Sequence, residues 1–552
     1  MPKCTKLALL AALLLAAGPQ SAHADKKTVC TITVNSPDER DVFRRYLPTG
    51  EFDMVELVER GRSDWLASAC SAGVRCDVLL ISGHFDGGTE FYSDRLDARE
   101  YLPVAELERA SCSDSCPGLF SQLKEVYLFG CNTLDPNAIR SASAEVTRSL
   151  VRSGHSIADA ERLAQVLNER HGESNREQMR HIFKGVPVIY GFSGKAPLGR
   201  YAGPLLERYF ESGSAEIGSG LPSARLLGLF APTSMTIAYG SSESDPDASY
   251  RDEVCRFADD RLSPAQRAGF VHTLLGREMA EVRMHLDRIE RYAQSLGAAE
   301  RESPAVAGAL DAIARDESAR LRYLEFARDA DQPAVRARMM DLARGLGWLS
   351  ASDQRDELIR MIGDQMAANT VSPAEVDLIC GLNKNSELGN DLHRLRLTPA
   401  QASNVNNAAV LACLGSASAH ARVLKALTSS KDEDVQIAEV YLRHRPIGDA
   451  GELRSAAAGI ARMSGSDAQV RALETLARHN LSDRDSLQEL TRVFLLAKSV
   501  RVQRAVAGIL LRSDYRAIGD PNLARALRQH RLKSPDGEDV IDILIRRLEM
   551  SS

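Results

Sequence analysis

The chain lacks several features that would assign it to a common class of binding protein or enzyme. It has no excess of positive charge, because 69 lysines and arginines stand against 75 aspartates and glutamates, a net charge of −6. This balance argues against a nucleic-acid binder, which needs a basic surface to displace counterions from phosphates. The sequence also has no HExxH motif, no paired metal-ligand spacing and no phosphate-binding loop. We therefore expect no metal and no cofactor.

The first 24 residues have the order of a secretory signal peptide. Lys3 and Lys6 precede the apolar run LALLAALLLAAG, and the small residues Ala22 and Ala24 are typical of a cleavage site. The run is shorter than the roughly 20 residues that span a bilayer, so a membrane anchor is the weaker interpretation. We expect a mature chain that begins near Asp25, is exported to the periplasm or secreted, and has no stable membrane span.

Removing the signal peptide leaves an odd number of cysteines in an oxidising compartment. They are Cys30, Cys70, Cys76, Cys112, Cys116, Cys131, Cys255, Cys380 and Cys413. Disulfide bonds are expected there, and at least one thiol must stay unpaired. The pairing cannot be derived from the sequence, although Cys112 with Cys116 and Cys380 with Cys413 are plausible local bridges. The Cys112 and Cys116 pair also fits two loop thiols or half of a metal site.

Short β-branched runs alternate with helical stretches from residue 25 to residue 240. Examples are KTVCTITVNS, CDVLLISGH, EVYLFGCNT and VPVIYGFSG, each followed by a stretch of helical or loop composition. Near-continuous apolar strands separated by helices predict a mostly parallel sheet covered on both faces. We therefore expect a doubly wound α/β domain over 25–240. Residues 241–252, within GSSESDPDASYRD, have the composition of a linker.

Strand signals are missing from residues 253–552, where amphipathic helices rich in Ala, Leu, Arg and Asp follow one another. A short polar segment precedes Val435, Val470 and Val502, and these valines are separated by 35 and 32 residues. That spacing is typical of two-helix repeats that stack into an α-solenoid. The segments resemble HEAT repeats, and an irregular helical domain is the alternative.

Two residues with catalytic chemistry follow two consecutive predicted strands. CDVLLISGH ends on His84, and EVYLFGC ends on Cys131. In a doubly wound sheet the ligand site lies beyond the carboxyl ends of the strands. If these strands are neighbours, they are about 4.8 Å apart and the two side chains flank one crevice. A cysteine beside a histidine is the minimum for nucleophilic acyl transfer. Each residue alone is more often structural, a turn histidine or a small core cysteine.

The blocks LLISGHFDGG and VYLFGCNT resemble the histidine and cysteine blocks of caspase-like cysteine peptidases, the clan of caspases, gingipains, separases and bacterial CHAT domains. VPVIYGFSG is similar to the segment after the catalytic cysteine of CHAT domains. The resemblance covers about residues 27–240. It implies a caspase-like fold with Cys131 as the nucleophile and His84 as the general acid and base.

The oxyanion of such a reaction is expected to bind backbone N–H groups of Cys131 and of the turn around His84. That turn contains Gly83, Phe85, Gly87 and Gly88. Many members of the clan place glycine directly after the histidine, whereas this chain has Phe85, which restricts the backbone.

The leading hypothesis is an exported cysteine endopeptidase whose helical repeats select a protein substrate or partner. The expected partners are therefore a protein or peptide substrate, with a second protein on the repeats as a further candidate, and no nucleic acid. The alternative is a scaffold or binding protein whose caspase-like domain is degenerate and non-catalytic.

Overall fold

The computed structural model describes residues 26–58, 66–86, 88–94, 100–113, 116, 118–137, 143–152, 154–171, 174–213, 216–245, 248–330, 332–395, 397–464, 467–479, 481–513, 518, 520–533 and 539–551. The expected signal peptide over 1–24 lies outside these residues. The chain divides into two compact units, residues 1–326 and residues 327–552.

A six-stranded sheet forms the centre of the first unit. Its order is β2 (Phe52–Val58), β1 (Lys27–Thr33), β3 (Val78–Ser82), β7 (Glu125–Phe129), β8 (Val188–Phe192) and β9 (Met235–Ala238). The pairs up to β8 are parallel, and β9 adds an antiparallel edge. A separate antiparallel sheet contains β4 (His84–Asp86), β5 (Glu90–Tyr92) and β6 (Tyr101–Pro103). The expected α/β layout of this region is confirmed.

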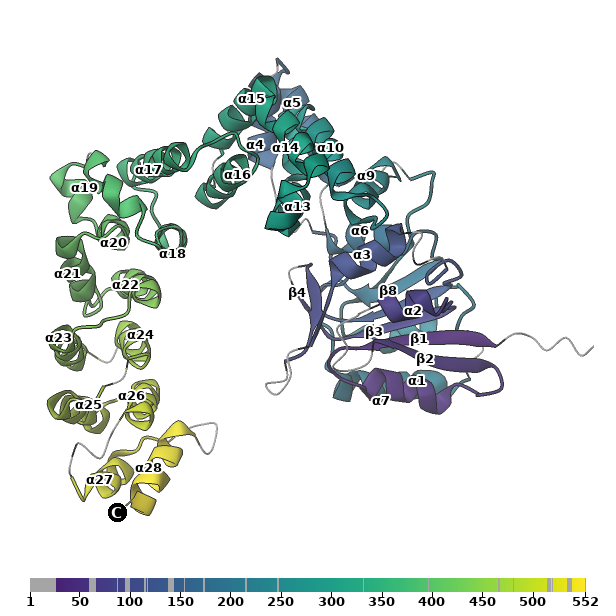
Figure 1. Cartoon of the computed structure of the whole chain (residues 1–552). Helices are drawn as coiled ribbons and strands as arrows, with labels where there is room; N and C mark the ends of the chain where they lie inside the picture. The colour runs from purple at the N-terminus through teal and green to yellow at the C-terminus, as the bar shows by residue number, and fades with distance from the viewer. Residues whose placement is uncertain are drawn as a thin grey trace, which may run out of the picture. The chain divides into compact units, whose positions relative to one another are not determined.

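Helices cover both faces of the large sheet because its central strands are apolar on both sides (Figure 1). In β7, Val126 and Leu128 pack into one core, while Tyr127 and Phe129 pack into the core on the other face. The helices up to the end of this α/β region are α1 (Asp38–Tyr46), α2 (Ala67–Ser71), α3 (Val104–Cys112), α4 (Ser143–Arg152), α5 (Ile157–His171), α6 (Asn175–Ile182), α7 (Gly199–Phe210) and α8 (Ala224–Leu229). Helices α1 and α7 cover one face, and α2, α3 and α6 cover the other.

The first unit also includes helices that follow the expected linker. They are α9 (Ala248–Ala258), α10 (Pro264–Leu275), α11 (Met279–Met284), α12 (Leu286–Ser295), α13 (Ala298–Glu302), α14 (Pro304–Arg315) and most of α15 (Glu317–Arg328). The units divide between Phe326 and Ala327, later than the expected linker over 241–252. Arg251 explains part of this difference, since its guanidinium donates to His181 O at 2.9 Å and to Ser111 Oγ at 3.1 Å. The start of α9 is therefore fastened to α3 and α6.

Helices make up the second unit. They are α16 (Pro333–Gly345), α17 (Ala351–Ala367), α18 (Pro373–Leu382), the 3₁₀ helix Leu388–Arg394, α19 (Pro399–Ser403), α20 (Val405–Cys413), α21 (Ala417–Ala426), α22 (Asp432–His444), α23 (Ala450–Ala461), α24 (Asp467–Leu476), α25 (Arg484–Leu496), α26 (Val500–Arg512), α27 (Leu523–His530) and α28 (Val540–Ser551). Helices α18, α20, α22, α24, α26 and α28 each contact the next, and so do α21, α23, α25 and α27. The expected helical C-terminal region is confirmed.

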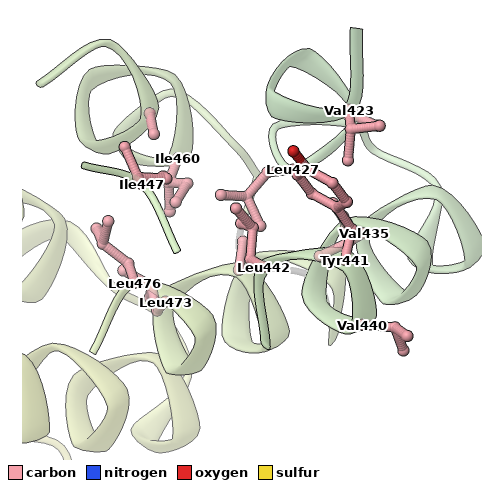
Figure 2. Close-up of a cluster of buried hydrophobic side chains, with 14 of the residues drawn as sticks. Val423, Leu427, Val435, Val440, Tyr441, Leu442, Ile447, Ile460, Leu473 and Leu476 are labelled. Atoms are coloured by element: carbon pink, nitrogen blue, oxygen red, sulfur yellow. The ribbon is translucent and has the colours of Figure 1, made fainter. Parts of the chain in front are cut away.

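One continuous apolar core lies between these two rows. Figure 2 shows part of it, where Val423 and Leu427 lie near Tyr441, and Ile460 lies above Leu473. Val435, Val470 and Val502 lie on α22, α24 and α26 and are all buried. The sequence spacing of these valines therefore corresponds to neighbouring helices of one row.

Four disulfide bonds join the described cysteines, and one expected bridge was wrong. Cys380 bonds to Cys413 as expected, but Cys112 bonds to Cys255 and Cys116 bonds to Cys70. The fourth bond joins Cys30 and Cys76. Cys112 ends α3, which packs on α9, and this packing brings it to the cysteine on α9, with Cα atoms 5.0 Å apart. Sequence proximity in the CxxxC segment did not decide the pairing.

Candidate active site

The carboxyl ends of β3 and β7 bring His84 and Cys131 to one edge of the sheet. Ser82 pairs with Phe129 as the last residues of these parallel neighbours. His84 and Cys131 each lie two residues further along the chain. Both line a pocket of about 40 Å³, together with residues after β1 and the segment from Ala196 to Gly199. The sequence-predicted pair therefore shares one cavity.

Gly130 allows the two strand ends to approach each other closely. A Cβ atom at Gly130 would lie 2.8 Å from Phe85 Cβ and 3.0 Å from Gly83 O, closer than such atoms approach. The Gly83 N–H donates to Phe129 O at 3.1 Å and continues the strand contact past the end of the sheet. A side chain at residue 130 would push the segments that carry His84 and Cys131 apart.

Cys131 is the one cysteine among the described residues that forms no disulfide, and its side chain is half-buried. The Ala196 N–H lies 3.4 Å from Cys131 Sγ and donates to it. Cys131's own N–H has no hydrogen-bond acceptor among the residues that the structure describes. The sulfur therefore has a donor, and a backbone N–H is available beside it.

The residue after Cys131 holds a backbone conformation that few side chains adopt. Asn132 has φ of 59°, in the left-handed region. Its N–H donates to Gly194 O at 2.7 Å, and Asn175 Nδ2 donates to Asn132 O at 2.8 Å. Contacts on both sides of the residue therefore maintain this conformation, which turns the chain sharply at the cysteine.

Thr133 fastens this turn to β8. Its hydroxyl donates to Gly130 O at 3.2 Å and accepts from the Phe192 N–H at 3.0 Å. Gly191 leaves room for this contact, because a Cβ there would lie 2.7 Å from Thr133 Oγ1. The segment VPVIYGFSG thus supports the cysteine turn from the neighbouring strand.

His84 begins β4 and is partly exposed, with Tyr92 opposite it in the antiparallel pair. Its Nε2 atom lies 3.2 Å from Asp94 Oδ2, close enough for an ion pair when the imidazole is protonated. This contact is not a hydrogen bond, because Nε2 has no hydrogen-bond partner among the described residues. Asp94 itself is largely exposed. The Nε2 atom therefore accepts or donates no hydrogen bond within the described part of the chain, while the ring lies 5.4 Å from that of Tyr92 between centroids.

The four residues expected to surround the oxyanion, Gly83, Phe85, Gly87 and Gly88, do not all lie in the pocket. Gly83 lines the pocket. The Phe85 ring is buried, and its centroid lies 4.6 Å from that of the Phe91 ring. The Phe85 side chain therefore packs in the core. Gly88 is buried and has φ of 74° in the turn after β4. Gly87 lies outside the described residues.

Glu39 is a third titratable side chain of the pocket, and the sequence reasoning missed it. It lies in the first turn of α1, is only 3% exposed, and lines the same cavity as His84 and Cys131. Its Oε2 atom is buried and has no hydrogen-bond partner among the described residues. Burial raises the pKa of Glu39 to about 7, and a hydrogen bond from its own backbone N–H offsets this only in part. A carboxylate here would gain strongly from a cation in the pocket.

Comparison with known proteins gives no relative: no family model, no curated protein and no solved structure matches the chain. Within the described ranges, no cluster of three or more His, Cys, Asp or Glu side chains could hold a metal ion. None of the helices in those ranges is long and apolar enough to cross a bilayer. The site must therefore be interpreted from its own chemistry.

Proposed function

We propose that the protein is an exported cysteine endopeptidase of the caspase-like type. The observation that carries this proposal is the shared pocket of His84 and Cys131, each two residues beyond a paired position of neighbouring strands. Eight other cysteines form disulfides, while Cys131 stays a thiol. Disulfides also support export, because they persist in oxidising compartments.

His84 takes the proton of the Cys131 thiol, and the resulting thiolate attacks the carbonyl carbon of the scissile peptide bond. The carbon–nitrogen bond then breaks, His84 protonates the departing amine, and a thioester to Cys131 remains. His84 next removes a proton from a water molecule that attacks the thioester, which releases the carboxylic acid and restores the thiol. The Ala196 N–H donates to the attacking sulfur, and the N–H of Cys131 is available to the oxyanion.

Glu39 gives this pocket a preference for a cationic side chain of the substrate. Its buried oxygen lacks a hydrogen-bond donor within the described part of the chain, and a lysine or arginine side chain would supply one together with a positive charge. The same cation would counter the desolvation that raises the pKa of Glu39.

The two helical rows of the second unit are proposed to form an α-solenoid of HEAT-like repeats. The support is the regular contact of alternate helices from α18 to α28 around one continuous core. Such a stack offers an extended surface, and we propose that it selects the protein substrate or a protein partner. If the α/β region is catalytically inactive, this surface alone is the function, as in a scaffold protein.

The test is cleavage of a positional-scanning fluorogenic peptide library by the mature chain, beside Cys131→Ala and His84→Ala variants. We expect cleavage by the native chain and loss of at least about 100-fold in rate for each variant, with melting temperatures unchanged. Two results together would overturn the proposal of an enzyme and favour a scaffold protein. They are that the native chain cleaves no peptide, and that iodoacetamide modifies the Cys131 thiol only after unfolding.

A further inference from the structure

A second and larger cavity lies in the first unit, away from Cys131. It has a volume of about 470 Å³ and is lined by the start of α3, the end of α9, and residues of α10 and α12. This volume is in the range of small-molecule sites, roughly 300–1,000 Å³. None of its lining residues belongs to the pocket of His84 and Cys131. The cavity is therefore a site separate from the proposed peptidase pocket.

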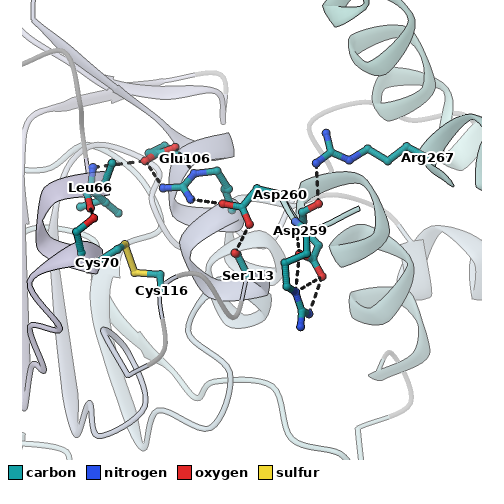
Figure 3. Close-up of polar contacts among 12 residues, drawn as sticks. Leu66, Cys70, Glu106, Ser113, Cys116, Asp259, Asp260 and Arg267 are labelled. Carbon is teal, nitrogen blue, oxygen red and sulfur yellow. Dashed lines mark hydrogen bonds and ion pairs between the residues drawn. A yellow bond between two sulfur atoms is a disulfide. The ribbon is translucent and has the colours of Figure 1, made fainter. Parts of the chain in front are cut away.

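The acidic side chains of this groove already have basic partners. Arg109 bonds to Glu106 at 2.8 Å and to Asp260 at 2.8 Å. Arg288 bonds to both oxygens of Glu108 at 3.0 and 3.1 Å in a buried pair. Figure 3 shows the first of these networks, which includes Glu106 and Asp260. The three carboxylates of the lining are therefore neutralised within the protein.

Two further arginines of the lining form no ion pair at contact distance with a carboxylate among the described residues, although the charge of Arg291 attracts the Glu108 carboxylate. Arg267 of α10 donates from Nη2 to the backbone oxygen of Asp259 at 2.6 Å, and its Nε atom is buried without an acceptor (Figure 3). Arg291 of α12 is exposed and donates only from Nε, to Asp287 O at 3.3 Å. Both side chains line the groove, so their positive charge adjoins one cavity.

Apolar groups complete the same lining. Phe257, Ala258 and Pro103 contribute carbon surface, and Tyr292 presents its ring while its hydroxyl donates to Pro264 O at 2.6 Å. The Tyr292 hydroxyl is thus occupied, and the ring offers mainly an apolar contact. A ligand that matches this cavity has an anionic group at one end and an apolar body at the other.

We propose that this groove binds a small organic anion, a molecule with a carboxylate or phosphate group on an apolar body, whose charge contacts Arg267 and Arg291. The guanidinium groups supply charge-assisted hydrogen bonds that the protein itself leaves unmade, among the residues described. The aromatic and proline side chains cover the apolar body.

The experiment is isothermal titration calorimetry of the full mature chain with phenyl phosphate, benzoate, inorganic phosphate and benzyl alcohol. The variants are Arg267→Gln and Arg291→Gln. Arg315→Gln is the control, because Arg315 is exposed on α14 and is absent from the lining. Melting temperatures of all variants check the fold, and Arg291→Gln changes an exposed side chain whose one hydrogen bond is to the backbone of its own helix.

We expect saturable binding of phenyl phosphate or benzoate at one site, and the tighter of the two identifies the anionic group. Each groove variant should weaken the affinity for this anion by about tenfold or more, while Arg315→Gln leaves the affinity unchanged. Inorganic phosphate should bind more weakly than phenyl phosphate, because it has no apolar body. The proposal is overturned if neither aromatic anion binds, if Arg291→Gln binds as tightly as the native chain, or if benzyl alcohol or inorganic phosphate binds as well as the aromatic anions.

Discussion

Ser82 and Phe129 face each other at the ends of β3 and β7, and the next two residues of each chain segment lead to His84 and Cys131. This shared register places the histidine and the cysteine at corresponding positions past two parallel strands. His84 and Cys131 line one pocket, and this pocket leaves Cys131 half-buried rather than enclosed in the core. The thiol of Cys131 is therefore the group whose reactivity reports most directly on the site.

Cys131 should react with iodoacetamide in the folded mature chain near neutral pH. Its sulfur is partly accessible and accepts a hydrogen bond from the Ala196 N–H, whereas the eight disulfide-bonded cysteines are protected. Intact-mass measurement should find one adduct without reductant and none on Cys131→Ala. An adduct that forms only in denaturant would show instead that the thiol belongs to the core.

Gly130→Ala should lower peptide cleavage strongly and destabilise the first unit by about 1–3 kcal/mol. The added methyl group would overlap Phe85 and the backbone of Gly83. This overlap would push apart the segments that carry His84 and Cys131. Gly228→Ala is the matched control, because a Cβ at that glycine in α8 has no atom within 4 Å. Equal activity of the two variants would contradict the close approach at Gly130.

The strands that carry the site were predictable because each is an apolar run that ends at glycine. Both faces of β3 and β7 are buried, so CDVLLISGH and EVYLFGCNT lack polar alternation and indicate central parallel strands. The odd cysteine count predicted at least one free thiol, and Cys131 is free. The helical periodicity of residues 253–552 likewise reflects real neighbours in one row, α22, α24 and α26.

Other parts of the site depend on contacts that no local pattern records. The strands of the small antiparallel sheet have three residues each, too few to show an alternation. Glu39 lies in a polar stretch, DERDVFRRY, and is buried only because the pocket walls cover the first turn of α1. The Cys112–Cys255 bond joins residues 143 positions apart, so it required the packing of α3 on α9.

Replacing Cys112 and Cys255 together by serine should loosen the junction between α3 and α9. Loss of a native disulfide typically costs about 2–5 kcal/mol. Hydrogen exchange should therefore become faster in peptides from α3 and α9 of this double variant. The control is the double serine variant of Cys380 and Cys413, whose bond lies in the second unit and whose effect should be confined to α18 and α20.

The stability of the native chain should fall as the pH rises from about 4.5 to about 7, in part because of Glu39. Burial raises the pKa of Glu39 in the folded state, so the folded chain keeps a proton that the unfolded chain releases. The full effect is on the order of 3 kcal/mol, present below pH 4.5 and lost by pH 7. Urea unfolding at several pH values should show this decrease in the native chain and in Glu51→Gln, an exposed control, but not in Glu39→Gln. Parallel pH profiles in all three proteins would contradict the burial of a titrating carboxyl.

Glu39 should also determine which peptides are cleaved. If a lysine or arginine side chain of the substrate contacts the buried carboxylate, Glu39→Gln loses the charge but keeps the shape. The value of kcat/KM for peptides with a basic residue before the scissile bond should then fall about 10-fold or more. Peptides with a neutral residue there should be cleaved at least as well as by the native chain, because the variant has no carboxylate to desolvate. A uniform loss on both kinds of peptide would mean that Glu39 only supports the pocket wall. A retained preference for basic residues would place the recognition of the cation on another acidic side chain.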